Sequence, residues 1–158
     1  MFQYYALFAA AIVAVDQISK YLVVQLVPLY QEIPLIPGVL ALTHVRNEGA
    51  AFSSFEGMQG MFTLIFLVFS MVVLYEYFKK PMPFAKAERW CIAAIYGGGL
   101  GNMVDRLRQG YVVDMLQTVF MEFPVFNVAD CFITCGCACL ILHMALFNRK
   151  FWKDDKKK

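Results

Sequence analysis

Four long apolar runs alternate with more polar segments along the chain. Because an α-helix rises 1.5 Å per residue, a run needs about 20 residues to cross a bilayer core of about 30 Å. The third run is the shortest and amounts to about 22 Å of helix, so we expect its end near Asp105 to lie below the membrane surface. The pattern predicts a membrane all-α protein with four transmembrane helices, at about residues 5–27, 61–78, 90–104 and 127–147.

The segment between the first two runs has a different pattern. Pro34, Pro37 and Gly38 interrupt it, and residues 39–47 then form an apolar stretch with β-branched side chains, which is typical of a strand. Residues 47–49 (NEG) indicate a turn, and the small residues 49–53 predict a second strand or a loop of close approach. We therefore expect a small extracytoplasmic β-rich platform that leans on the lipid.

Composition supports a membrane protein of one domain over residues 1–158. Apolar residues make up 60% of the chain and charged residues 16%, against about 45–50% and about 25% in soluble domains. The mean hydropathy is +0.57, which excludes intrinsic disorder. The basic clusters are not interleaved with aromatic residues, so nothing indicates binding to nucleic acid.

The basic residues predict the orientation of the chain. Ten of the 14 Lys and Arg residues lie in residues 79–89 and 149–158. By the positive-inside rule both segments are expected in the cytoplasm, together with both termini. Residues 28–60 and 105–126 are then expected to face outward.

Two ionisable residues lie inside the first apolar run. Asp16 and Lys20 are four residues apart and therefore share one helix face. Charges at this depth are costly and usually pair with each other, which favours a buried, self-neutralising pair, although a proton relay or a substrate contact is an alternative. Ser19 beside Lys20 is a pattern of Ser/Lys hydrolases, but adjacent helical residues do not face each other.

The third run ends in a cluster of glycines and polar residues. Gly97 and Gly101 form a G-x-x-x-G face, which allows close helix packing. Asn102, Asp105 and Arg106 follow with a spacing that places them on one side of the helix. We interpret these three side chains as the scaffold of a shared site.

Two further acids are the candidates for catalysis. Asp114 lies in the apolar stretch 110–116, and Asp130 follows a possible helix N-cap, Asn127, by three residues. Taken singly, Asp114 could be a solvated loop acid and Asp130 an acid that stabilises a helix N-terminus. Taken together, both belong at the same outer depth, and two carboxyls that share a proton can carry out aspartic hydrolysis.

The cysteines and histidines do not predict a metal site. Cys131, Cys135 and Cys139 lie away from the helical stripe of Asp130, and no C-x-x-C spacing occurs. We interpret the five cysteines as small apolar packing residues. His44 and His143 are expected on opposite sides of the membrane, so we expect no metal and no cofactor.

Five motifs occur in one order across nearly the whole chain. They are residues 16–20 (DQISK), 46–53 (RNEGAAFS), 97–106 (GGGLGNMVDR), 112–114 (VVD) and 126–130 (FNVAD). In this order the chain resembles the lipoprotein signal peptidase family, also called signal peptidase II. Its length and its predicted four spans agree with the resemblance. Met115 departs from the pattern, because bulky aromatic residues commonly follow the catalytic aspartate.

The resemblance implies an intramembrane aspartic peptidase of the bacterial inner membrane. Its substrates would be diacylglyceryl-modified prolipoproteins, cut before the lipidated cysteine, and cyclic peptides that mimic the transition state would inhibit it. The implied catalytic residues are Asp114 and Asp130. The implied substrate-binding or dyad-orienting residues are Asn47, Asn102, Arg106 and Asn127, and the implied supporting residues are Asp16, Lys20, Gly98, Gly101 and Asp105.

Two other classes of function compete with this interpretation. A small four-span transporter could use Asp16 as a proton site, which predicts that polar residues converge at the bilayer midplane. A non-enzymatic assembly subunit is the third possibility, and it gives no reason for two acids that face each other. Most polar residues gather instead at the outer ends of the third and fourth runs, which favours the peptidase.

Overall fold

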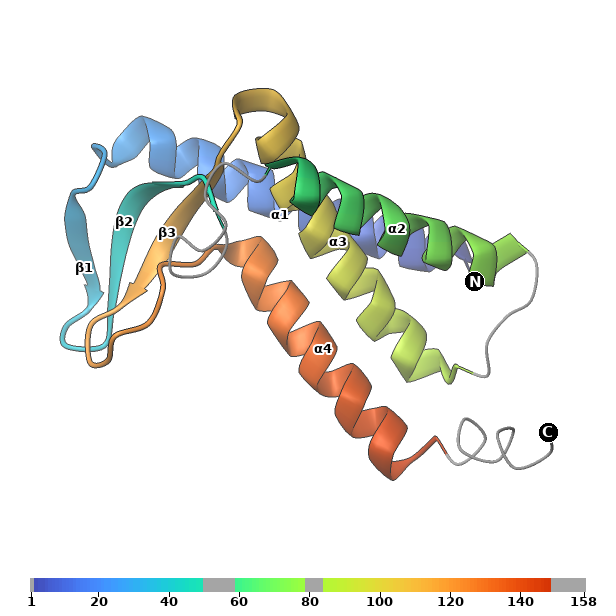
Figure 1. Cartoon of the computed structure of the whole chain (residues 1–158). Helices are drawn as coiled ribbons and strands as arrows, with labels where there is room; N and C mark the ends of the chain where they lie inside the picture. Colours follow the sequence, from blue (N-terminus) through green and yellow to red (C-terminus); the bar gives the residue numbers. More distant parts are fainter. Residues whose placement is uncertain (1, 50–58, 79–83, 149–158) are drawn as a thin grey trace.

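Four helices and one antiparallel sheet make up the described part of the chain, which is residues 2–49, 59–78 and 84–148 of the computed structural model. The sheet lies at one end of the helices, beside the C-terminal end of α1 and the N-terminal end of α4 (Figure 1). In chain order the elements are α1 (Phe2–Leu26), β1 (Glu32–Ile36), β2 (Leu40–Asn47), α2 (Gln59–Phe78), α3 (Lys86–Gln109), β3 (Val112–Thr118) and α4 (Val128–Leu146).

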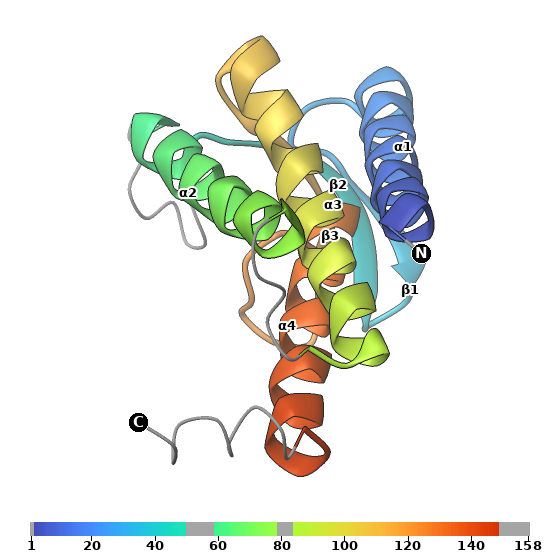
Figure 2. The same ribbon diagram turned by 90° about the vertical axis from the view of Figure 1, so that its right-hand side faces the viewer.

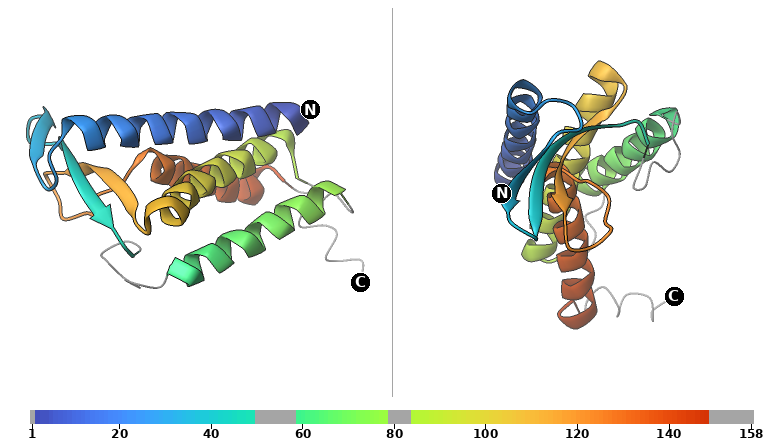
Figure 3. Two further views of the ribbon diagram at one scale, coloured as in Figure 1. Left: turned by 90° about the horizontal axis from the view of Figure 1, so that it is seen from above. Right: turned by 90° about the vertical axis from the view of Figure 1, so that its left-hand side faces the viewer.

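Helix α3 lies in the middle of the bundle. Figures 2 and 3 show α1 and α2 on opposite sides of α3, with α4 crossing a third side. Three successive glycines make this possible, since each faces a different helix. A Cβ at Gly97 would lie 2.9 Å from the Ala9 oxygen of α1, one at Gly98 2.5 Å from the Ala129 oxygen of α4, and one at Gly99 3.0 Å from Phe66 of α2.

Helix α3 extends beyond the apolar run from which we predicted the third span. The apolar run 90–104 implied a short helix, but the helix has 24 residues, Lys86–Gln109, which is about 36 Å. The apolar run underestimates the helix because the polar residues at both ends are part of it. Asp105 and Arg106 therefore lie within α3, which continues to Gln109 into the segment 105–126 that we expect to face outward. The other three helices agree with their predicted runs to within a few residues.

The predicted four membrane crossings are supported only in part. Among the described residues, two helices are long and apolar enough to cross a membrane, α1 and α4, while the apolar stretch of α2 is shorter, Gly60–Tyr75. Helix α3 does not meet this test because it contains glycines and charged residues. Its neighbours shield it on three sides, so it needs fewer apolar side chains than a helix that faces lipid.

The sheet confirms the predicted β-rich unit. Its strand order is β1-β2-β3, and both pairs are antiparallel. The strand predicted at 39–47 is β2, whereas β1 and β3 were not predicted as individual strands. The predicted small-residue segment 49–53 lies outside the described residues from position 50 onward.

A small apolar cluster attaches the sheet to the helices. Met115 of β3 packs against Val23 and Val27 near the end of α1. Because side chains alternate across a strand, Asp114 points to the opposite face from Met115. Met115, which differs from the aromatic residue common in the family at this position, is thus a packing residue. Because Met115 contacts α1, Asp114 points toward the other helices.

Candidate active site

A single asparagine side chain connects the two candidate acids. Asn127 is the N-cap of α4: its Oδ1 accepts from the Asp130 backbone N–H at 3.0 Å, and its own N–H donates to Asp130 Oδ2 at 3.1 Å. This reciprocal pattern is a capping arrangement. The Asn127 Nδ2 also donates to Asp114 Oδ1 at 2.6 Å. The cap that starts α4 therefore also sets Asp114 relative to Asp130.

Asp114 lies on β3 and is almost fully buried, with 2% of its surface exposed. Its second oxygen accepts from Asn47 Nδ2 of the neighbouring strand at 2.7 Å. Burial raises the pKa of Asp114 to about 6, against the effect of the hydrogen bonds from Asn47 and Asn127, and the nearby Asp130 charge adds to the rise. Asp114 can thus hold a proton at a pH at which an ordinary aspartate is ionised.

Asp130 is oriented by an amide from α3. Asn102 Nδ2 donates to Asp130 Oδ1 at 2.8 Å, while its Oδ1 accepts from Lys20 Nζ at 2.8 Å. Lys20 has only donor protons, so it requires the oxygen of Asn102 and directs the amide nitrogen to Asp130. The structure brings Asn47, Asn102 and Asn127 together around the two acids.

Charged residues of α1 and α3 form a buried network behind the two acids. Lys20 pairs with Asp16 at 2.8 Å, as predicted, and also with Asp105 at 3.0 Å. Asp16 Oδ1 accepts from the backbone N–H of Ala129 at 3.0 Å, and Asp105 Oδ2 accepts from that of Val113 at 3.2 Å. Asp16 therefore holds the backbone directly before Asp130, Asp105 holds the backbone directly before Asp114, and Lys20 pairs with both carboxylates.

Gly98 and Gly101 allow this arrangement. A Cβ at Gly101 would lie 2.6 Å from Asp16 Oδ2, so the glycine leaves room for the buried carboxylate. Gly98 leaves room for the Ala129 carbonyl in the same way. Gly101 thus allows α1, and Gly98 allows α4, to approach α3 closely.

Gln17 is a supporting residue that our sequence reasoning missed. Its Nε2 donates to Asp105 Oδ1 at 2.8 Å and to the Gly101 oxygen at 3.2 Å. The available signal was its position directly after Asp16 inside an apolar run. Ser19, by contrast, donates to the Asp16 backbone oxygen, a local helix bond that gives it no part in the site.

Arg106 lies on the wall of the site rather than on the acids. Its Nη2 donates to the Gly49 oxygen at 3.2 Å, and its guanidinium lies 4.6 Å from the centre of the Phe62 ring. Among the described residues no hydrogen bond is seen from Arg106 to Asp114 or Asp130. Its charge still acts on both acids across the cavity that they share.

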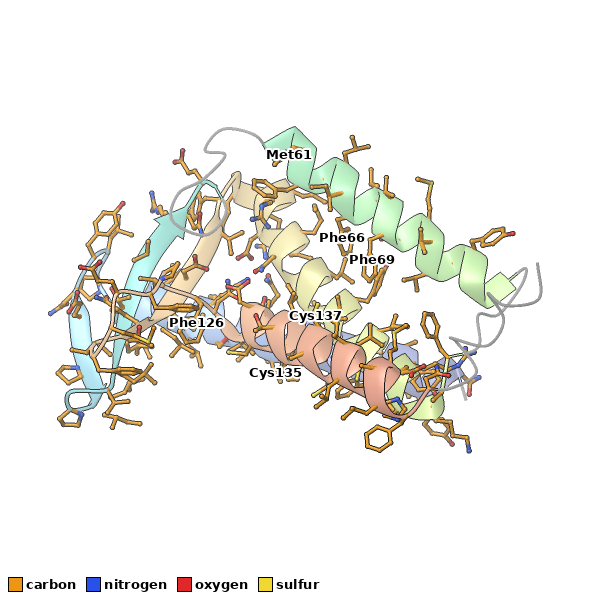
Figure 4. The ribbon with its side chains drawn as sticks, turned by 60° about the horizontal axis from the view of Figure 1, so that its bottom comes forward. Met61, Phe66, Phe69, Phe126, Cys135 and Cys137 are labelled. Carbon is orange, nitrogen blue, oxygen red and sulfur yellow. The ribbon has the colours of Figure 1, made fainter. Side chains whose placement is uncertain are left out.

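A cavity of about 670 Å³ lies in front of the two acids, bounded by α2, α3, α4 and β3. Its polar part contains Asp114, Asp130 and the residues around them, and its apolar part includes aromatic side chains from α2. Figure 4 shows two of these, Phe66 and Phe69, on the side of α2 that faces α3. A polar catalytic end that continues into an apolar space suits a substrate that is itself partly in lipid. The lining residues used below are Asn47, Phe62, Phe66, Phe69, Asn102, Arg106, Asp114, Asp130, Cys131, Thr134 and Cys135.

The cysteines and histidines fall into separate places. All five cysteines are free thiols, and two of them, Cys131 and Cys135, line the cavity, which the packing interpretation did not foresee. Within the described ranges no group of three His, Cys, Asp or Glu residues could hold a metal ion. His44 lies against the Val27 oxygen near the sheet, whereas His143 pairs with Glu88 at the other end of the helices.

A protein-family model described as signal peptidase (SPase) II matches residues 8–146, which is most of the chain. The chain belongs to the signal peptidase II family. It is 43% identical to a lipoprotein signal peptidase of Enterococcus faecalis over 155 residues, which cover 96% of this chain and 93% of the relative. A relative of the same description from Listeria monocytogenes is 38% identical over 152 residues, covering 93% of this chain and 96% of the relative.

The fold of this peptidase is also similar to solved structures. One, described as a bacterial membrane enzyme structure at 2.3 Å resolution, matches with a TM-score of 0.86 and 28% identity, covering 95% of this chain and 92% of the other. A second, at 1.9 Å resolution, has a TM-score of 0.82 and 29% identity, with coverage of 93% and 96%. This signal peptidase is therefore an aspartic peptidase and a bacterial membrane enzyme, as the five motifs implied.

Proposed function

We propose that this peptidase removes signal peptides from diacylglyceryl-modified prolipoproteins, cutting before the lipidated cysteine, with Asp114 and Asp130 as its catalytic pair. The observation that carries the proposal is Asn127, whose side chain binds Asp114 at 2.6 Å while its backbone N–H binds Asp130 at 3.1 Å. The relatives described as lipoprotein signal peptidases support the substrate class.

The two acids take different roles in the proposed mechanism. Asp114, with its raised pKa, holds a proton and polarises the scissile carbonyl. Asp130 lies in the first turn of α4, where the helix N-terminus favours a negative charge, so it accepts a proton from the attacking water. The peptide C–N bond then breaks, and the leaving amine takes the proton that Asp130 received.

The surrounding amides keep the two acids in these roles. Asn47 and Asn127 both donate to Asp114, and Asn102 donates to Asp130. Each acid therefore keeps its orientation when the proton moves. Arg106, on the cavity wall, is placed to bind a carbonyl of the bound substrate in the same way as it binds the Gly49 oxygen.

The substrate reaches the pair from the lipid. The cavity lies between α2 and α4, and its apolar lining fits a signal helix and the acyl chains of the diacylglyceryl group. The substrate is then dissolved in the membrane lipid and enters the cavity from it to reach Asp114 and Asp130.

The peptidase is a single multi-pass domain over residues 1–158 with both termini in the cytoplasm. The start of α1 and the end of α4 both lie at the end of the bundle away from the sheet (Figure 1), which supports placing both on the same side of the membrane. Reporter fusions after Lys86 and Lys158 should read cytoplasmic, and one after Glu56 should read external. An external C-terminus would place the acids on the wrong side.

Lipid modification is the feature of the substrate to test directly. Purified peptidase is given a diacylglyceryl-modified precursor or the same precursor with its cysteine replaced by serine, which cannot carry the group. Only the first should be cut, directly before the modified cysteine. Cleavage of both would contradict the substrate class, and cleavage of neither would contradict the function.

Inhibitors give an independent test of the mechanism. Chelators and serine-directed reagents should leave cleavage unchanged, whereas cyclic peptides that mimic the transition state should block it. Loss of activity in EDTA that zinc restores would contradict the aspartic mechanism.

The transporter alternative is not favoured by any observation. Asp16, its proposed proton site, is 0% exposed and is held by Lys20 and the Ala129 N–H. Asp16 also lies outside the lining of the cavity.

A further inference from the structure

The wall of the cavity carries two thiols that the proposed mechanism does not use. Cys131 and Cys135 both line the cavity of about 670 Å³, on the same part of α4 as Asp130 and Thr134. Cys135 is exposed, Cys131 is half-buried, and both are free. One helical turn separates them, so the cavity has nucleophilic side chains on two adjoining turns of one wall.

The other three cysteines provide a natural contrast within the same chain. Cys91, Cys137 and Cys139 are also free thiols, and Cys139 is exposed. None of the three belongs to the lining of the cavity. Reaction at the cavity can therefore be separated from reaction at cysteines in general.

The surroundings suit an apolar electrophile. Hydrolysis requires that water reach Asp130, and Cys131 follows Asp130 directly in α4. The thiolate is the reactive form of cysteine, and the Asp130 charge opposes its formation at Cys131, so the exposed Cys135 is the thiol expected to react first. The cavity also presents Phe62, Phe66 and Phe69, which would concentrate an apolar reagent near the thiols.

We propose that Cys131 and Cys135 form a modification site at which membrane-soluble α,β-unsaturated carbonyl compounds attach and block cleavage. The thiolate sulfur forms a bond to the β-carbon of the reagent, and the resulting enolate takes up the proton that the thiol lost, so no oxidant or leaving group is needed. The proposal rests on the proposed function in one respect, namely that this cavity is the one that the substrate occupies.

N-Ethylmaleimide is a suitable probe of the purified full-length peptidase. Peptide mapping by mass spectrometry identifies the modified cysteines, and cleavage of the lipid-modified precursor is measured on the same samples. Adducts at Cys131 or Cys135 should appear together with the loss of most of the cleavage rate. Full cleavage by enzyme with both thiols modified would overturn the proposal.

Two sets of variants separate the cavity thiols from the rest, each compared with its own untreated rate. The variant with Cys131→Ser and Cys135→Ser should keep its rate in the reagent. The variant with Cys91→Ser, Cys137→Ser and Cys139→Ser should lose its rate as the unsubstituted enzyme does. The opposite pattern would place the sensitive thiol outside the cavity and overturn the proposal.

Protection by substrate provides a readout that does not depend on turnover. In the Asp114→Asn variant, bound precursor should slow adduct formation at Cys131 and Cys135 but not at Cys139. Equal labelling of all three with and without precursor would contradict a thiol site in the substrate cavity. Labelled cavity thiols in an enzyme that cuts no precursor would instead contradict the proposed function alone.

Discussion

Asn102 donates a hydrogen bond to Asp130 over 2.8 Å while the oxygen of the same amide is held by Lys20. A charge on α1 thus fixes the orientation of a side chain on α3, which in turn orients an acid on α4. The three helices meet at this one amide. Loss of any member is expected to loosen the acid even where the helices stay packed.

The Asp16 and Lys20 pair is expected to support the fold. Removal of one partner leaves an unpaired buried charge, which costs several kcal/mol before relaxation. Asp16→Ala or Lys20→Ala should therefore lower the thermal midpoint and the yield in detergent, and the double replacement should be milder than the worse single. A fully stable but inactive Asp16→Ala would argue for a direct part in the chemistry.

Replacement of either acid should abolish cleavage. Asn is nearly isosteric with Asp but can neither accept a proton from water nor return it, so Asp114→Asn and Asp130→Asn should each lose at least about 10²-fold in kcat. The double variant should be hardly worse than either single, because residues that act as a unit are not additive. Binding of the lipid-modified precursor should survive, and substantial turnover by either purified variant would contradict the assignment.

The pKa of Asp114 predicts a fall in activity on the alkaline side. Burial raises this pKa to about 6, and the proposed acid must be protonated to polarise the carbonyl. The ratio kcat/KM should therefore fall as pH rises through about 6, measured on the lipid-modified precursor with stability checked at each pH. A rate that rises through the same window would contradict the role of Asp114 as the acid.

The same pKa predicts a change in stability of known sign. The folded-state pKa of Asp114 lies above the ordinary 3.8. The stabilising contribution of Asp114 to the free energy of unfolding is therefore fully present at low pH and is lost as pH rises through about 6. Asp114→Asn, which cannot ionise, should lose this part of the pH dependence. Thermal midpoints from pH 4 to pH 8 for both proteins check the prediction, and parallel curves would contradict it.

Gly98→Ala should damage both the fold and the site. The new Cβ would lie 2.5 Å from the Ala129 oxygen, a backbone atom that can move only if α4 moves. Since Asp130 follows Ala129, the thermal midpoint and kcat should both fall, by about 1–3 kcal/mol for the stability part. Gly60→Ala is the matched control, because nothing lies within 4 Å of its Cβ, and equal effects of the two would contradict the explanation.

A polar cluster at the far end of the helices should contribute stability alone. Glu88 accepts from Asn148 Nδ2 at 2.6 Å and from the Ala85 N–H at 2.7 Å, and it lies 2.9 Å from His143. Asn148 and Ala85 both donate to Oε2, so Glu88→Gln can keep its one oxygen for them but must place its NH2 group against His143 Nδ1. The loss of the charged acceptor at His143 should cost about 1–3 kcal/mol in unfolding free energy. The exposed Glu122→Gln is the control, and activity per folded enzyme should be the same in both.

The sequence motifs identified which residues gather around the two acids better than hydropathy identified the extent of the helices. Short motifs contain Asp114, Asp130 and the three asparagines, so these residues could be identified from the sequence. The extent of α3 could not be predicted, because hydropathy cannot show that three neighbouring helices shield a helix that contains glycines and charges. The second partner of Lys20 was also out of reach, since Asp105 is distant in the chain and meets Lys20 only after folding.

The composition of α3 has a consequence for how the protein enters the membrane. Helix α3 carries charged residues in its first and last turns and three successive glycines in its middle, and it is not among the described helices that are apolar enough to span a membrane. Integration of α3 therefore depends on its neighbours, and α4, which closes its third side, is synthesised last. Proteolytic competence thus arises only after nearly the whole chain has been made, so nascent membrane proteins nearby are not exposed to a half-built peptidase.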